Sequence, residues 1–206
     1  MDNAAILGVT CLYTGPAAEV TDSDGSIQAQ IISDLIDARA IDGLAISVGK
    51  LKAIEPVIEK AVQAGIPVIT FDSDAPNSKR IAYIGTDNYF FGVQLAKILK
   101  QMVPSGGLYG TVGYSSPNIV ERARGFEDEM AAGGEWTAAE GSPANYGQNL
   151  TLAIEQMHAF AKLNVTAITP VLGGAMRSGL WKDFVDENRD RNITIVSGDA
   201  MPNQLE

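Results

Sequence analysis

The chain has 206 residues, of which 46% are hydrophobic and 19% charged, a composition typical of a globular protein that buries a sizeable core. This length fits one large domain or two domains of about 100 residues each. Every apolar run is shorter than the roughly 18 residues of a membrane span, which excludes direct membrane insertion. A formal net charge of −10 without any Lys/Arg cluster would repel a phosphate backbone and excludes nucleic acid as a partner.

The first half of the chain alternates short apolar strands with amphipathic helices. We expect strands at 10–13, 43–47, 68–71 and 81–84. The helices that their apolar spacing predicts are 24–39, 51–64 and 87–102. Cys11, the single cysteine, lies within the first of these strands, so we expect it to be a buried core thiol.

The second half repeats this alternation after a break at Pro104–Gly107, where a proline and two glycines combine a helix stop with flexible residues. The expected strands are 108–113, 136–139, 166–171 and 193–197, and the expected helices are 118–132, 148–162 and 174–188. Alternating strands and helices predict parallel sheets with right-handed crossovers. The predicted fold is therefore α/β, with two doubly wound parallel-sheet lobes at 1–103 and 104–206.

Two acidic residues, Asp72 and Asp74, directly follow the apolar strand 68–71. Ligands of open α/β sheets bind outside the carboxyl ends of the strands, so these carboxylates are candidate ligand-binding groups. The alternative is that Asp-Ser-Asp-Ala-Pro-Asn is only a turn whose Asp and Asn side chains bond their own backbone. A similar run of strand, Asp, Ala and Pro-Asn at 194–203 places Asp199 at the end of a strand in the second lobe, and two lobes with facing acids would form a cleft.

Arg122 shares the inward face of the helix 118–132 with Ile119 and Phe126, and it lies in the first turn after a strand. An arginine at the carboxyl edge of a sheet supplies a fixed fork of donors for a hydroxylated or anionic ligand. The alternative is an arginine whose aliphatic stem merely covers the core. Asp87 and Asn88 precede a helix and are interpreted as caps in preference to ligands.

The sequence predicts neither a metal site nor a cofactor. His158 has no second His or Cys nearby, and no GxGxxG motif exists for a dinucleotide. One enzyme hypothesis remains as an alternative, because 68–74 matches the strand-DxD start of haloacid-dehalogenase-like phosphatases. Asp72 would then be the nucleophile, Asp74 the general acid and Asp199 a Mg²⁺ ligand. However, that family continues Gly-Thr where this chain has Ala75-Pro76, and its DxD strand is the first strand of the fold.

A different family accounts for more of the chain, through an ordered series of six motifs between Leu7 and Pro202. They are Leu12-Tyr-Thr-Gly-Pro16, Ile27-Gln-Ala-Gln-Ile31, Asp42-Gly-Leu-Ala-Ile-Ser47, Ala64-Gly-Ile-Pro-Val-Ile-Thr-Phe-Asp-Ser-Asp74, Ala82-Tyr-Ile-Gly-Thr-Asp-Asn88 and Glu121-Arg-Ala-Arg-Gly-Phe126. Together they resemble the type I periplasmic sugar-binding proteins, the ribose-binding-like receptors of ABC importers. The Phe-Asp-Ser-Asp and Tyr-Ser-Ser-Pro motifs are similar to those of the rhamnose and autoinducer-2 branch.

The resemblance implies a non-catalytic periplasmic receptor that binds a monosaccharide or related polyol in the interlobe cleft and delivers it to an importer permease. Asp72 resembles the sugar-hydroxyl acceptor of the first lobe, with Asp74 beside it, and Arg122 and Asp199 resemble the arginine and acid of the second lobe. Ionised groups with bidentate geometry suit vicinal hydroxyls. At Leu172 the chain departs from the asparagine that the family often carries, so the sugar itself stays open.

Both ends also depart from the family, because the resemblance implies a further strand and helix before Ala4 and further elements after Glu206. We therefore expect a fragment, incomplete at both ends, whose missing signal peptide carries no information. The same fold occurs in the effector domain of lac-repressor-like transcription regulators, which remains an alternative. A secretory leader or a helix-turn-helix in the complete gene would distinguish the two.

Overall fold

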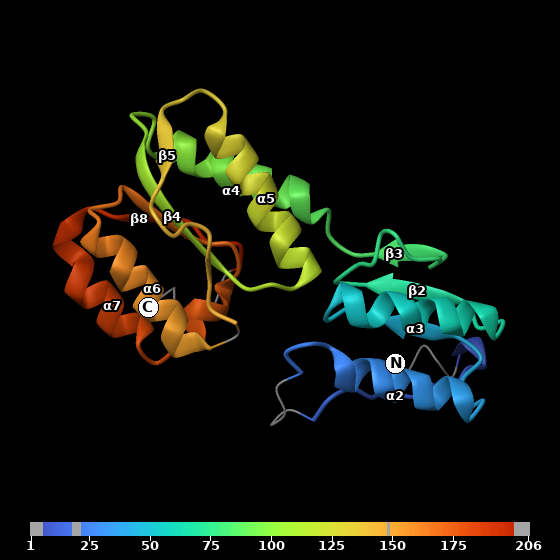
Figure 1. Ribbon diagram of the computed structural model, residues 1–206. Helices are drawn as coiled ribbons and strands as arrows, with labels where there is room; N and C mark the ends of the chain where they lie inside the picture. Colours follow the sequence, from blue (N-terminus) through green and yellow to red (C-terminus); the bar gives the residue numbers. More distant parts are fainter. Residues whose placement is uncertain (1–5, 18–21, 148, 200–206) are drawn as a thin grey trace. The chain divides into compact units, whose positions relative to one another are not determined.

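The computed structural model describes residues 6–17, 22–147 and 149–199, which form two compact units, Met1–Ile84 and Gly85–Glu206 (Figure 1). Each unit has a parallel sheet with helices packed on it, and the predicted doubly wound α/β class is confirmed. Within the described ranges, no helix combines the length and the apolar character needed to cross a membrane.

Unit 1 is built on a three-stranded parallel sheet in the order β1 (Leu44–Ile46), β2 (Val68–Phe71) and β3 (Ala82–Ile84). Helix α3 (Leu51–Gln63) packs on β2, and α2 (Ser26–Asp37) packs on α3. Isoleucines of the two helices, including Ile32, Ile54 and Ile58, form its core with Val68 of β2. These are the residues whose helical spacing predicted the apolar faces.

The expected first strand at 10–13 is absent: residues 9–15 have no strand, and their side chains are exposed. Tyr13 is 97% exposed and Cys11 is also exposed, so the prediction of a buried thiol is wrong. A strand exists only where a neighbour satisfies its backbone N–H and C=O groups. In the described part of unit 1, β1 pairs only with β2, and 10–13 has no partner of this kind.

Unit 2 contains the parallel sheet β5-β4-β7-β8, with the short β6 beside β4. Its strands are β4 (Gly107–Gly113), β5 (Trp136–Ala138), β6 (Ala144–Asn145), β7 (Ala167–Pro170) and β8 (Thr194–Ile195). Its α-helices are α4 (Asn88–Met102), α5 (Pro117–Ala131), α6 (Leu150–Lys162) and α7 (Trp181–Asn188). A 3₁₀ helix, η1 (Gly173–Arg177), precedes α7, so the single helix predicted at 174–188 is divided in two; η2 (Arg189–Arg191) follows it.

Helices cover both faces of this sheet, as Figure 1 shows for α4 and α5 against α6 and α7. Consecutive residues of β4 point to opposite faces. Val112 joins the cluster formed with α6 and α7, which includes Met157 and Phe184. Tyr109 joins the other cluster, with Leu99 of α4 and Phe126 of α5. The sheet is therefore buried on both sides, as expected for parallel strands.

The division between the units differs from the predicted one, since it falls between Ile84 and Gly85 and not at Pro104–Gly107. Helix α4 packs closely on α5, because glycines let their backbones approach. A Cβ at Gly92 would lie 1.9 Å from the carbonyl oxygen of Arg122, and one at Gly125 would lie 2.0 Å from that of Tyr89. The Pro104–Gly107 turn therefore only leads from α4 to β4 within unit 2.

Candidate functional site

In unit 1, polar side chains gather around Asp72, which directly follows β2. The hydroxyl of Ser47, at the end of β1, donates to Asp72 Oδ2 at 3.1 Å. The hydroxyl of Tyr83, on β3, donates to the backbone oxygen of Asp72 at 2.9 Å. Asp72 is exposed. Three neighbouring parallel strands thus contribute to one polar cluster at their carboxyl ends, as the sequence predicted for Asp72.

Sequence reasoning missed Ser47 and Tyr83. A signal for Ser47 existed, because it follows the strand that neighbours β2 and is the first polar residue after that strand's apolar run. Tyr83 gave no such signal, since an aromatic residue within a strand is usual for any sheet.

The backbone at Asp72 is fixed in a left-handed conformation, with φ of 57°. Aspartate tolerates this region better than most residues, because its short side chain bonds locally. The N–H of Asp72 donates to the Ile84 carbonyl at 3.1 Å, which fastens the turn to β3. On the other side, the Ser73 hydroxyl donates to the Val48 carbonyl at 2.8 Å. The turn therefore holds the Asp72 carboxylate in a defined position.

Asp74 has a different environment, because its carboxylate faces Arg80. The Arg80 fork donates to both carboxylate oxygens, with Nη2 at 2.6 Å from Oδ2. The Thr70 hydroxyl adds a bond of 2.5 Å to Oδ1. Partial burial raises the pKa of Asp74, but the hydrogen bonds from Arg80 and Thr70 outweigh it and hold the pKa below its usual value. Asp74 is thus ionised and paired within its own unit.

In unit 2, Arg122 of α5 is 9% exposed, and its guanidinium is held from three sides. Asn88 Oδ1 accepts from Arg122 Nε at 3.2 Å and from Nη2 at 2.9 Å. The Val171 carbonyl accepts from Nη1 at 3.0 Å. The ring of Phe91 lies 4.3 Å below the guanidinium carbon. Arg122 therefore lies inward, as predicted, with a fixed orientation.

Asp199 follows β8 and lies next to this arginine, with Oδ1 3.9 Å from Arg122 Nη1. Its Oδ2 accepts from the N–H of Gly173, just after β7, at 2.8 Å. The Asp199 side chain is 43% exposed. A Cβ at Gly198 would lie 2.5 Å from the Val171 carbonyl oxygen, so only glycine allows this approach. The structure thus brings Arg122 and Asp199 together; the Ala200–Asn203 part of the predicted repeat lies outside the described residues.

Helix α4 contributes the remaining partner. Asp87 caps the helix by accepting from the N–H of Phe90 at 2.9 Å, as predicted. Asn88 is not a cap: it is 8% exposed and bonds Arg122, so that prediction is wrong. A helix-start asparagine is a usual cap, and only the close α4–α5 packing redirects it. Leu172, after β7, is half-buried and packs on the α6 and α7 cluster.

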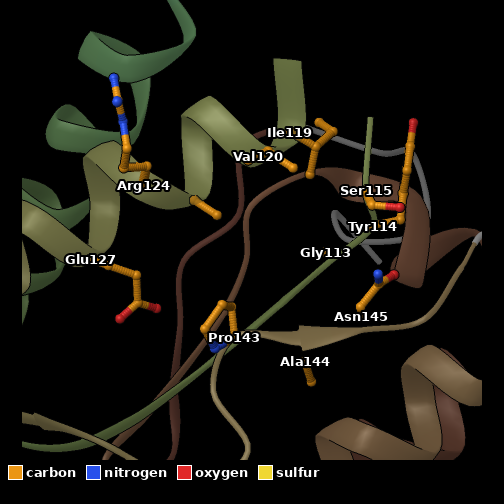
Figure 2. Close-up of a pocket in the computed structure, with 11 residues that line it drawn as sticks. Gly113, Tyr114, Ser115, Ile119, Val120, Arg124, Glu127, Pro143, Ala144 and Asn145 are labelled. Carbon is orange, nitrogen blue, oxygen red and sulfur yellow. The ribbon is translucent and has the colours of Figure 1, made fainter. Parts of the chain in front are cut away.

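A separate pocket of about 380 Å³ lies on another flank of α5, in unit 2. Figure 2 shows Val120 and Glu127 of α5 on one side, and Pro143 and Asn145 on the other. The Glu127 carboxylate accepts from the Tyr109 hydroxyl at 2.5 Å and from the Thr111 hydroxyl at 2.6 Å. None of the four sequence-predicted site residues lines this pocket.

The described residues contain no group of three or more His, Cys, Asp or Glu side chains placed to hold a metal ion. The chemistry at the two sheet edges is that of hydrogen bonding by ionised groups. Asp72 and Asp199 are carboxylate acceptors, and Arg122 is a donor. Such groups bind neutral polar ligands with several hydroxyls more strongly than neutral amides or hydroxyls do.

Comparisons with known proteins extend over the whole chain. Residues 2–206 match a family profile described as a periplasmic binding protein domain. A D-ribose/D-allose-binding protein from Pseudomonas aeruginosa is 33% identical over 123 residues, which cover 55% of this chain and 38% of that protein. The chain thus matches little more than a third of that relative's length.

Two solved structures are also similar. An ABC transporter solute-binding protein from Burkholderia graminis, in complex with D-arabinose, is 26% identical with a TM-score of 0.72, over 88% of this chain and 64% of that one. A solute-binding protein from Agrobacterium vitis with bound D-fucose reaches a TM-score of 0.80 at 21% identity, over 98% of this chain and 71% of that one. The second is a likeness of fold alone.

Proposed function

The chain belongs to the periplasmic binding protein family, and from this premise we propose that it works as the solute-binding receptor of a bacterial sugar ABC importer. Its ligand would be a monosaccharide or a related polyol. Similar proteins support this class, since one is a D-ribose/D-allose-binding protein and another is a solute-binding protein in complex with D-arabinose. The proposed location is the periplasm, and the proposed protein partner is the importer's permease.

The observation that carries the proposal is the Arg122–Asp199 arrangement. A cation and a carboxylate lie 3.9 Å apart at the carboxyl edge of one sheet, and both are oriented by bonds to protein groups. Vicinal hydroxyls each donate and accept, so they match a donor beside an acceptor. Hydrogen bonds to ionised groups contribute about 1.5–3 kcal/mol each, enough for a few of them to select one sugar.

Asp72 is the group that unit 1 would contribute, as an exposed carboxylate on a fixed turn. Asp74 would act indirectly, because its bonds to Arg80 and Thr70 hold the turn next to Asp72. The proposed ligand-binding residues are thus Asp72, Arg122 and Asp199. Asp74 is proposed to support them.

We infer that the protein is not an enzyme. The phosphatase alternative needs Asp74 as a general acid, which must carry a proton to donate. The fork of Arg80 keeps the pKa of Asp74 below its usual value, so the group is ionised at neutral pH. The pairing with Arg80 therefore argues against Asp74 as that acid.

The proposal is tested by calorimetric titration of the protein, expressed from its complete gene, with D-ribose, D-allose, D-arabinose and D-fucose. We expect saturable binding of at least one sugar, with one site per chain. A parallel assay with a generic phosphomonoester and Mg²⁺ should give no turnover. Absence of binding to every sugar in a panel widened to all common aldopentoses, aldohexoses and polyols, or turnover that Asp72→Asn abolishes, would overturn the proposal.

A further inference from the structure

Asn88 is buried, and both the oxygen and the nitrogen of its side-chain amide form hydrogen bonds. Its Oδ1 accepts from Arg122 Nε and Nη2, at 3.2 and 2.9 Å. Its Nδ2 donates to the backbone oxygen of Thr86 at 3.0 Å. Thr86 belongs to Gly85–Asp87, the first residues of unit 2, which follow directly after β3 of unit 1. One side chain therefore links the start of unit 2 to the site arginine.

The chemistry permits only one orientation of this amide. A guanidinium carries N–H donors and no acceptor, so the amide oxygen has to face Arg122. The amide nitrogen then faces the Thr86 carbonyl, which can only accept. An amide turned by 180° would set donor against donor on one side and acceptor against acceptor on the other. The bond to Thr86 therefore fixes the orientation of the Asn88 amide, and the amide oxygen in turn fixes the orientation of the Arg122 guanidinium.

Packing makes this contact possible. Gly92 lies one turn after Asn88 on α4, and its lack of a side chain lets α4 approach the Arg122 backbone. Phe91 places its ring against one face of the guanidinium, 4.3 Å from its carbon. The amide and the ring together define the plane of the guanidinium, because one bonds its edge and the other covers its face.

We propose that Asn88 is a positioning residue of the sugar site: it holds the Arg122 guanidinium in its ligand-binding orientation and ties that orientation to Gly85–Asp87. This inference rests on the proposed function and deepens it, because Asn88 acts through Arg122 and does not itself touch the sugar. Aspartate at this position keeps the acceptor for Arg122 and loses only the donor to Thr86. Alanine loses both, and serine is too short to reach the guanidinium.

The test measures the hydrogen exchange rate of the Arg122 Nε–H group by ¹⁵N NMR in the full-length protein. We expect Asn88→Ala and Asn88→Ser to speed this exchange at least about tenfold, because a bonded N–H is protected from solvent. Asn88→Asp should keep it slow. Asn149→Ala is the matched control, because Asn149 also starts a helix of unit 2 but bonds the N–H of Leu152. It should leave the Arg122 signal unchanged.

Sugar titration of the same variants completes the test. Asn88→Ala should weaken binding about tenfold, and Asn88→Asp should restore most of the affinity. In an Arg122→Ala background, Asn88→Ala should cause no further loss, because a residue that acts through another has no effect once that residue is gone.

The inference and the proposed function fail in different ways. Unchanged Nε–H exchange in both Asn88→Ala and Asn88→Ser, or an additive loss of affinity in the double variant, would overturn the positioning role. Sugar binding that Arg122→Ala leaves at the parental level would instead overturn the proposed site. If Asn88→Ala does not fold, Asn88→Ser and Asn88→Asp still decide between the outcomes.

Discussion

The two candidate clusters differ in how they hold their ionised groups. In unit 1, Asp72 is exposed and accepts a hydrogen bond from the neutral hydroxyl of Ser47, whereas the neighbouring Asp74 forms a partly buried ion pair with Arg80. In unit 2, the candidate ligand group Arg122 is itself the buried ion, held by Asn88, Val171 and Phe91. In unit 1, the proposed ligand group (Asp72) and the ion pair that supports the fold (Asp74–Arg80) are thus separate, whereas in unit 2 Arg122 is both the proposed ligand group and a buried ion bonded within the fold.

Equivalent positions at the edges of two sheets therefore do not imply equal effects of substitution on stability. A substitution at an exposed carboxylate removes a ligand contact and little else. A substitution at a buried cation also leaves its partners unsatisfied, and each such group costs about 1–3 kcal/mol. We therefore expect substitutions to affect sugar binding and stability separately in unit 1 and together in unit 2.

The largest effect is expected from Arg122→Ala, which should lower both sugar affinity and stability. We expect a roughly 30- to 1000-fold loss of affinity and a free energy of unfolding lower by about 2–4 kcal/mol. Calorimetry and urea unfolding measure the two. Arg124→Ala is the control: this exposed arginine lies two residues later and pairs with Glu121 at 2.7 Å, so its loss should change stability by less than about 1 kcal/mol.

Asp72→Asn should lower affinity with little change in stability. Because the carboxylate is exposed, we expect a loss of roughly 10- to 100-fold in affinity, and a change in unfolding free energy within about 0.5 kcal/mol. The same titration and urea unfolding apply. If the unfolding free energy fell as much as in Arg122→Ala, the contrast between the two units would be lost.

Gly92→Ala should destabilise unit 2 through its backbone, without altering a polar group. The added methyl group would lie 1.9 Å from the Arg122 carbonyl oxygen, so α4 and α5 must separate. We expect the unfolding free energy to fall by about 1–3 kcal/mol. Gly179→Ala, where a Cβ meets nothing within 4 Å, is the matched control and should be nearly neutral. Equal effects of the two variants on thermal unfolding would contradict the close helix packing.

The smallest effect is expected for Asp74, and it should depend on pH. Hydrogen bonds from Arg80 and Thr70 hold its pKa in the folded protein below the unfolded value of about 3.9. The contribution to stability is therefore fully present above that value and disappears as pH falls through the lower, folded pKa.

Asp74→Asn should consequently lower the unfolding free energy by about 1–2 kcal/mol at pH 7, with the difference from the parent shrinking toward pH 3. Urea unfolding at several pH values measures this. A variant whose deficit were the same at pH 7 and pH 3 would show that the ion pair does not contribute through its charge.

Most of the helices and strands could be predicted from the sequence, because an element that buries one face carries apolar residues at its own period. The helical spacing of apolar residues in 51–64 and 118–132 predicted α3 and α5, and the apolar run ending at Phe71 predicted β2. The same reasoning placed Asp72 and Asp199 after strands, and Arg122 on an inward face. These are local properties, since a strand or helix determines which side of itself each residue occupies.

Contacts between distant elements could not be predicted in this way. The positions of Asp74 after a strand and of Asn88 at a helix start could be predicted from the sequence. The pairing of Arg80 with Asp74 and the bond between Asn88 and Arg122 depend on tertiary packing. Tertiary packing likewise determines that 10–13 is no strand and that α4 belongs to unit 2. The physical reason is that a strand, a hydrogen bond or an ion pair needs a partner, and the partner's place depends on how the elements pack.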